Sequence, residues 1–239
     1  MRRVLLLPGL DGTGELFAPF VARAPAGLAV EVARLPERLT EYPALADWAL
    51  GALRLDPETV LVAESFAGPL AVLIAARTRL AAVVLVNTWI VSPYSQAWHW
   101  LIRPWAFRVP PPRRVLRARM LGATASEALV ARARQVVASV PPAVMAGRLR
   151  AMMRADVRRE AAEVARGGTP LVVLHGDGDG LVPRRSVGHV EEAVPVKPTV
   201  IHLDGPHLLL QVEPETCWRA LGPWVGGALA EASARHDTS

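Results

Sequence analysis

A single serine marks a change from strand to helix in T-V-L-V-A-E-S-F-A-G-P-L, residues 59–70. Residues 60–63 form a short apolar run that is typical of a buried strand, and the residues from Phe66 onward favour a helix. A serine on so tight a turn projects its hydroxyl clear of the backbone, which is what a nucleophile needs. Serine is also a common N-cap of ordinary helices, so this turn alone leaves both interpretations of Ser65 open.

Small residues surround this serine. Ala63 and Ala67 stand two positions before and after it, where glycine is usual because strand and helix pass very close together. The strict G-x-S-x-G pattern is therefore absent, but alanine is the next smallest residue and Gly68 follows. Pro69 falls in the first helical turn, where its missing N–H costs nothing.

A serine is a weak nucleophile unless a base activates it and an acid orients that base. The predicted strand 170–174 leads into H-G-D-G-D-G-L-V-P, which offers Asp177 and Asp179 as acids. Asp and Gly also dominate ordinary turns, so this loop has a plainer interpretation. Both aspartates remain candidates on these grounds.

The base is expected in D-G-P-H-L-L-L-Q, residues 204–211, where His207 follows the predicted strand 199–203. A lone loop histidine is often merely solvated. Here, however, serine, acid and histidine follow one another in the order Ser, Asp, His, each at the carboxyl end of a predicted strand. Carboxyl ends of parallel strands meet at one edge of a sheet, so we expect a catalytic triad there.

Acyl chemistry also needs N–H donors for a developing oxyanion. The loop P-G-L-D-G-T-G, residues 8–14, follows the first apolar run and brings the backbone N–H of Leu10 as one candidate. The N–H of Phe66, at the start of the helix, is the other. A generic glycine-rich turn is the plainer interpretation, and a phosphate-binding loop is less favoured because the G-x-G-x-x-G and Gly-Lys-Ser/Thr patterns are absent.

The chain as a whole alternates apolar runs with helical periodicity, which predicts an α/β fold with a parallel sheet. The expected strands are residues 4–7, 28–35, 60–63, 81–86, 170–174 and 199–203. The expected helices are residues 15–24, 45–53, 66–77, 127–140, 143–164 and 214–232. Residues 92–166 contain no convincing strand, so we expect a helical insertion there, between core segments 1–91 and 167–239.

Composition excludes several classes of protein. The chain has 239 residues, is 51% hydrophobic and 21% charged, and is therefore expected to build a substantial core. Its one cysteine, Cys217, allows no intramolecular disulfide, and no apolar run reaches the length of a secretory or membrane-spanning segment. We therefore expect a cytoplasmic protein with no membrane span. The net charge of +5 comes from arginines dispersed along the chain, so nucleic-acid binding is not expected.

These motifs together resemble the serine esterases of the α/β-hydrolase superfamily. The segments that carry the resemblance are V-L-L-L-P-G-L-D-G-T-G, V-L-V-A-E-S-F-A-G-P-L, V-L-H-G-D-G-D-G-L-V-P and D-G-P-H-L-L. The P-G-L-D-G-T-G and A-E-S-F-A-G forms also resemble small bacterial hydrolases with a helical cap and the hydrolase-like part of plant phytyl-ester synthases. A more distant similarity is to the pimeloyl-carrier-protein methyl esterase of biotin synthesis.

The resemblance implies a mainly parallel sheet of about six strands with helices on both faces, and a cap formed by residues 92–166. The family's G-x-x-D-x-x-V-P arrangement falls on Gly176, Asp179, Val182 and Pro183, which favours Asp179 over Asp177 as the acid. It also implies a serine hydrolase that cleaves carboxylic esters through an acyl-enzyme, with no metal or other cofactor. The alternatives are an acyltransferase using the same triad, an esterase of carrier-linked methyl esters, or a binding protein that keeps the fold without turnover.

The cap offers candidates for substrate contact. Trp98, Trp105 and Met152 are predicted to line an acyl pocket, although such residues more often only pack a cap onto a core. The cap also carries several arginines, which are candidates to attract an acidic acyl carrier protein or an anionic substrate; a solvated face is the plainer interpretation. A small-molecule ester is the expected substrate.

Overall fold

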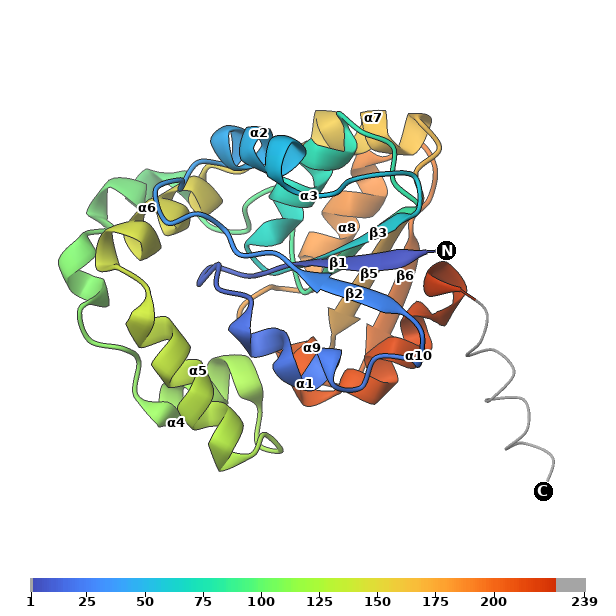
Figure 1. Cartoon of the computed structure of the whole chain (residues 1–239). Helices are drawn as coiled ribbons and strands as arrows, with labels where there is room; N and C mark the ends of the chain where they lie inside the picture. The colour runs from blue at the N-terminus through green and yellow to red at the C-terminus, as the bar shows by residue number, and fades with distance from the viewer. Residues whose placement is uncertain (1, 227–239) are drawn as a thin grey trace, which may run out of the picture.

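The computed structural model describes residues 2–226, except for the side chain of Trp98, and is built around a six-stranded sheet (Figure 1). All neighbouring strands are parallel, in the order β2-β1-β3-β4-β5-β6. The strands are β1 (Arg3–Leu7), β2 (Ala29–Val32), β3 (Thr59–Glu64), β4 (Ala82–Val86), β5 (Leu171–Gly176) and β6 (Thr199–Leu203). The four central strands are buried throughout, which is why they read as continuous apolar runs in the sequence.

Helices cover both faces of the sheet, and alternate residues of each strand point to opposite layers (Figure 1). Leu61 of β3 packs into the layer formed by α2 (Tyr42–Ala52), α3 (Ala67–Ala75), α7 (Arg158–Arg166) and α8 (Arg185–Ala193). Val62 packs into the other layer, with α1 (Ala18–Val21), α9 (Leu209–Val212) and α10 (Pro214–Val225). The predicted α/β class, with a parallel six-stranded sheet, is therefore confirmed.

The segment between β4 and β5 forms a cap beside the carboxyl edge of the sheet (Figure 1, green to yellow). Its elements are η2 (Gln96–Leu101), η3 (Pro104–Phe107), α4 (Arg113–Leu116), the π-helical turn η4 (Arg117–Leu121), α5 (Glu127–Ser139) and α6 (Pro142–Met153). An antiparallel bridge between Val91 and Asp156 closes the base of this segment. In the described part of the chain, no helix is long and apolar enough to cross a membrane.

Several expected element bounds need correction. The single helix expected over residues 143–164 is two helices, α6 and α7, separated by residues 154–157. Helix α7 packs its apolar side, including Ala161 and Val164, into the core beside α3, so the expected insertion boundary at residue 166 takes in a core helix. The helix expected over residues 15–24 is shorter, a 3-10 turn η1 (Glu15–Phe17) followed by α1. The final helix ends at Val225, and residues 227–232 of its expected span lie outside the described residues.

The crossing of β4 and α3 leaves no room for a side chain at Gly68. A Cβ at this position would lie 2.1 Å from Thr88 Oγ1 and 2.6 Å from Thr88 Cγ2. The usual glycine position two residues after the serine is Ala67 in this chain. The closest approach of the helix to Thr88 falls one residue later, at Gly68. This contact sets how closely the helix that follows Ser65 approaches the neighbouring strand.

Substituting Gly68→Ala should lower the free energy of unfolding by about 1–3 kcal/mol, because Thr88 must move and release its hydrogen bond to the backbone of Ser65. Urea denaturation measures the change. Gly51→Ala, at an exposed position of α2 with nothing within 4 Å of the added Cβ, is the matched control and should raise stability by about 0.5–1 kcal/mol. Equal changes in the free energy of unfolding for the two variants would contradict the close approach of Thr88 to Gly68.

Candidate active site

Ser65 occupies a strained turn between β3 and α3. Its φ of 54° lies in the left-handed region, which a residue with a side chain adopts only when its surroundings hold it there. Ser65 O accepts hydrogen bonds from Gly68 N, at 3.2 Å, and from the Thr88 hydroxyl. The buried Tyr42 hydroxyl donates to Phe66 O at 2.9 Å. These contacts fix the backbone on both sides of the serine hydroxyl.

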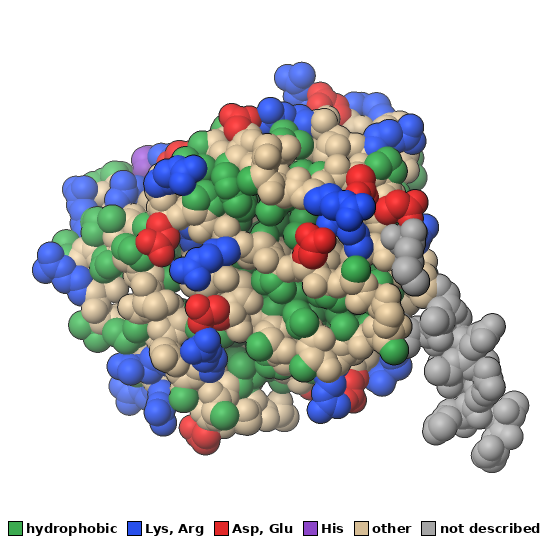
Figure 2. Space-filling view, in the orientation of Figure 1, with side chains coloured by type: hydrophobic (Ala, Val, Ile, Leu, Met, Phe, Trp, Pro, Cys, Tyr) green, Lys and Arg blue, Asp and Glu red, His purple; other side chains and the backbone are tan. Residues whose placement is uncertain are grey.

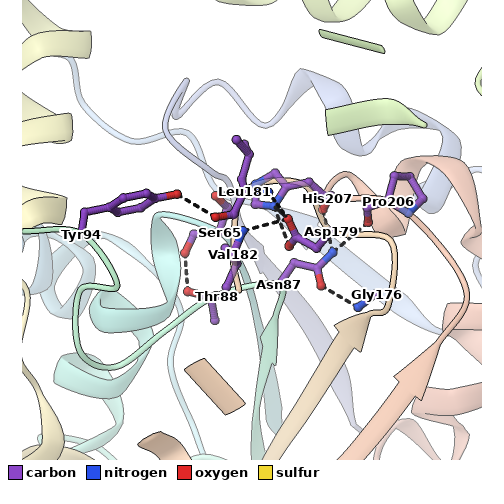
Figure 3. Close-up of polar contacts among 10 residues, drawn as sticks. All are labelled: Ser65, Asn87, Thr88, Tyr94, Gly176, Asp179, Leu181, Val182, Pro206 and His207. Atoms are coloured by element: carbon purple, nitrogen blue, oxygen red, sulfur yellow. Dashed lines mark hydrogen bonds and ion pairs between the residues drawn. The ribbon is translucent and has the colours of Figure 1, made fainter. Parts of the chain in front are cut away.

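The structure brings Ser65, His207 and Asp179 together (Figure 3). Ser65 Oγ lies 2.9 Å from His207 Nε2, and His207 Nδ1 lies 2.8 Å and 3.0 Å from the two Asp179 carboxylate oxygens. Asp179 Oδ1 also accepts from the backbone N–H groups of Leu181, at 2.7 Å, and Val182, at 2.9 Å. The carboxylate is fully buried, and these donors compensate for its lost hydration.

Asp177 lies in the same loop but faces another histidine. Its Oδ1 accepts from His202 Nδ1 at 2.9 Å, and the Arg184 guanidinium lies 3.9 Å away. The side chain is about half exposed, whereas that of Asp179 is buried against His207. The geometry therefore places Asp179, rather than Asp177, beside the predicted base.

Asn87 is a buried polar residue that joins the loops carrying the acid and the histidine (Figure 3). It follows β4 with a positive φ of 44°. Its side-chain amide donates to Pro206 O at 2.9 Å and His207 O at 2.8 Å, and its Oδ1 accepts from Gly176 N at 2.7 Å. One side chain thus holds the end of β5 against the loop that presents His207.

The two predicted oxyanion donors lie beside the serine. Leu10 and Phe66 line the same cavity as Ser65, and a Cβ at Gly9 would lie 3.6 Å from Ser65 Cβ. Among the described residues, neither Leu10 N–H nor Phe66 N–H donates to another group. Two unpaired backbone donors beside a serine hydroxyl are the arrangement that stabilises a tetrahedral oxyanion.

Arg148, on cap helix α6, is completely buried against the loop that carries Leu10. Its guanidinium donates to the carbonyl oxygens of Leu10, at 3.1 Å, and Asp11, at 2.8 Å. It also reaches Leu35 O, at 3.4 Å, and Pro36 O, at 3.3 Å. The cap is therefore tied through one side chain to the backbone that would present an oxyanion donor.

Glu64, immediately before the serine, is a buried carboxyl group with one partner. Gln211 Nε2 donates to its Oε2 at 2.8 Å, and its Oε1 has no hydrogen-bond partner. Burial, reinforced by the negative charges of Asp11 and Asp179, raises the pKa of Glu64 to about 8. The Glu64 carboxyl is therefore mainly neutral below that pH.

A cavity of about 610 Å³ opens at the serine, between the core and the cap. Its lining is largely apolar and includes Trp89, Ile102, Phe107, Leu116, Met145 and Leu149. Of the predicted pocket residues, Met152 lines the cavity. Trp105 does not; its side chain is 67% exposed, because Phe107 takes the inward position on the same turn. The side chain of Trp98 lies outside the described part of the structure.

No group of three or more His, Cys, Asp or Glu side chains that could hold a metal ion occurs within residues 2–226. The polar residues that line the cavity with Ser65 and His207 include Asp11, Glu64 and Tyr94.

The described sheet, with a serine at the β3–α3 turn, an acid after β5 and a histidine after β6, defines the α/β-hydrolase fold. Solved structures of this fold are similar over almost the whole chain. An esterase from Thermogutta terrifontis has a TM-score of 0.75 at 22% identity, covering 94% of this chain and 89% of that one. An enol-lactonase from Burkholderia xenovorans has a TM-score of 0.75 at 18% identity, covering 93% and 90%.

A bromoperoxidase from Bacillus anthracis is similar to the same degree, with a TM-score of 0.75 at 18% identity over 93% of this chain and 91% of that one. At such identities the comparisons establish the fold, which is shared by proteins of different chemistry. No protein-family model matches the sequence, and no curated protein sequence matches it.

Sequence reasoning overlooked three residues of this site. Asn87 is a polar residue directly after the apolar run of β4, at the carboxyl edge of the sheet, and that position was the available signal. Arg148 lies among apolar residues of α6, where a charged residue needs a partner. Glu64 ends an otherwise apolar strand, next to the serine.

Substituting Asn87→Ala should lower the free energy of unfolding by about 2–4 kcal/mol, since two buried carbonyls and one buried N–H lose their partner. The chain offers an exposed amide as the control, Gln135→Ala on α5, for which a change within about 0.5 kcal/mol is expected. Chemical denaturation measures both variants. If Asn87→Ala lowers the free energy of unfolding by less than about 1 kcal/mol, the loops after β5 and β6 hold together without the Asn87 side chain.

Glu64 should make stability depend on pH. Its folded-state pKa of about 8 lies above its ordinary value of 4.5, so the folded chain binds a proton that the unfolded chain releases between these values. Stability is therefore fully present below the lower value and is lost as pH rises through the higher one. Between about pH 5 and about pH 8 the loss should be about 2–4 kcal/mol, and Glu64→Gln should remove it.

Urea denaturation across this range tests the expectation, with the exposed Glu192→Gln as the matched substitution. Wild type and Glu192→Gln should show the same pH dependence, and Glu64→Gln a flatter one. Parallel curves for all three proteins would mean that Glu64 is ionised in the folded state near neutral pH.

Proposed function

We propose that this protein is a serine hydrolase that cleaves carboxylic esters through an acyl-enzyme. The observation that carries the proposal is the hydrogen-bonded chain from Ser65 Oγ through His207 to Asp179. Ser65, at one end of this chain, lines an apolar cavity. The similar structures of an esterase and an enol-lactonase support a hydrolase in general. A small-molecule ester is the proposed substrate, and the proposed chemistry uses no metal or other cofactor.

In the first half-reaction, Ser65 Oγ attacks the ester carbonyl carbon while its proton passes to His207 Nε2. Asp179 holds the Nδ1–H of the imidazole and stabilises the cation that forms. The oxyanion accepts hydrogen bonds from Leu10 N–H and Phe66 N–H, each worth about 3 kcal/mol to the transition state. His207 then gives the proton to the leaving alkoxide, and the alcohol departs.

In the second half-reaction, a water molecule attacks the acyl carbon and passes its proton to His207. The tetrahedral intermediate collapses, the bond to Ser65 Oγ breaks, and the proton returns to the serine oxygen. The carboxylic acid is released, and the enzyme regains its starting state.

The cavity points to an apolar acyl or alcohol group. Its volume of about 610 Å³ lies within the range of small-molecule sites, and side chains such as Leu116, Met145 and Met153 offer no hydrogen bonds to a polar substrate. The same lining favours acyl transfer as a second candidate, because a lipophilic alcohol can occupy it in place of water. With Cys217 buried and unpaired, we propose the reducing cytoplasm as the site of action.

A fluorophosphonate probe should form one adduct with the wild-type protein, detected by intact mass, and none with Ser65→Ala. His207→Ala should label far more slowly, because the serine loses its base. For hydrolysis of 4-nitrophenyl esters, both variants should lose about 10³-fold or more in kcat/KM. Failure of folded wild-type protein to label would support the non-catalytic alternative.

The two neighbouring aspartates provide a matched pair. Asp179→Asn should lower kcat about 10³–10⁴-fold, because the imidazole loses the acceptor that sets its tautomer. Asp177→Asn removes the same charge two residues away and should change kcat less than about threefold, since Asp177 faces His202. Adding a long-chain alcohol and measuring ester formation separates hydrolysis from acyl transfer.

A further inference from the structure

One stretch of the cap differs from the rest of the chain in charge. Residues 92–126 contain no Asp or Glu, and they contain the arginines Arg103, Arg108, Arg113, Arg114, Arg117 and Arg119. Within the described residues, only Arg117 of this set has a carboxylate partner, Glu127. This stretch therefore presents uncompensated positive charge at the outer side of the cap.

The same stretch carries most of the large hydrophobic side chains that the described chain exposes. Six of the eight such residues lie here: Tyr94, Trp100, Leu101, Trp105, Val109 and Val115. Trp100 is 56%, Trp105 67% and Val109 76% exposed. In Figure 2, hydrophobic and basic side chains lie side by side along the cap. We call residues 94–115 the cap edge.

The cap edge is continuous with the mouth of the cavity. Ile102, Ala106 and Phe107 line the cavity, whereas their chain neighbours Leu101 and Trp105 are exposed. Val109 does both, since it lines the cavity and is largely exposed. An apolar molecule lying on the cap edge is therefore next to the entrance that leads to Ser65.

We propose that the cap edge docks the protein on an anionic lipid surface. Tryptophan rings favour the boundary between hydrocarbon and head groups, and arginines bind lipid phosphates. Apolar side chains with interleaved cations, such as Trp100, Leu101 and Arg103, fit this boundary. Docking would place the cavity mouth at the surface, so that an ester-bearing amphiphile passes from the lipid to the serine without crossing water.

The shape of the cap edge favours a lipid surface over an acidic protein partner. Trp100 and Leu101 belong to the short turn η2 and Trp105 to the short turn η3, and all three are exposed. A lipid surface admits projecting side chains of any arrangement, whereas a specific protein interface needs a matched shape. An acidic acyl carrier protein is the competing occupant.

Flotation of the protein with vesicles tests the proposal. The vesicles are equal mixtures of diether phosphatidylglycerol and diether phosphatidylcholine, which contain no carboxylic ester, compared with pure diether phosphatidylcholine. Docking is then measured independently of the proposed hydrolysis. We expect binding to the anionic vesicles alone, weakened as NaCl rises from about 0.05 M to about 0.5 M.

The variants separate a specific face from general basicity. Arg103→Gln with Arg108→Gln should weaken binding about tenfold. Arg79→Gln with Arg166→Gln removes the same charge at the opposite edge of the sheet and should weaken it less than about threefold. Trp105→Ser should reduce binding about tenfold, and Val196→Ser, at a distant exposed position, should leave it unchanged. Circular dichroism and the midpoint of thermal unfolding check that each variant is folded.

Three results would overturn the proposal. The first is equal binding to neutral and anionic vesicles, and the second is equal loss in the two arginine pairs. The third is an absence of vesicle binding together with capture of an acidic acyl carrier protein that depends on Arg103 and Trp105. That result would assign the cap edge to a protein partner.

Discussion

The site depends on two left-handed residues at the ends of neighbouring strands. Ser65 after β3 and Asn87 after β4 are the two non-glycine residues of the described chain with positive φ. Neither conformation is favourable by itself, and each is held by hydrogen bonds from the other segments of the site. The Thr88 hydroxyl holds the Ser65 carbonyl, and the Asn87 amide holds the loop of His207. Strain is thus concentrated at the carboxyl edge of the sheet, where the turn exposes the serine hydroxyl.

Two buried carboxyl groups beside this turn have different hydrogen-bond partners. Asp179 accepts hydrogen bonds from two backbone N–H groups and from the imidazole of His207. Glu64 is buried with one carboxyl oxygen unpaired, and this burial, which outweighs the hydrogen bond from Gln211, raises its pKa. Below its pKa the Glu64 carboxyl adds no negative charge beside Ser65, which avoids the cost of burying an unpaired charge.

The sheet and the order of its reactive residues could be predicted because each rests on local sequence. Apolar runs mark the buried strands, and the loops after β3, β5 and β6 carry serine, acid and histidine. Arg148 and Asn87 escaped prediction because their partners are backbone carbonyls of distant segments, which leave no side-chain pattern in the sequence. The division between α6 and α7 was missed because apolar periodicity continues across residues 154–157. The orientation of Trp105 could not be read from a turn as short as η3.

One part of the cap, helix α6, is held to the core by Arg148, whereas the cap edge is exposed. This difference bears on where a substrate enters. Arg148 has no carboxylate partner in the described chain, so its burial is offset by carbonyl oxygens of two core loops. Any movement of α6 away from the core would leave the guanidinium and the carbonyls of Leu10 and Asp11 unpaired, which opposes opening on that side. The elements η2 and η3 pack against α6 and expose Trp100 and Trp105 beside the cavity mouth. Because Arg148 holds the backbone of Leu10 from α6, entry of a substrate beside η2 and η3 is compatible with the proposed oxyanion donor staying in place.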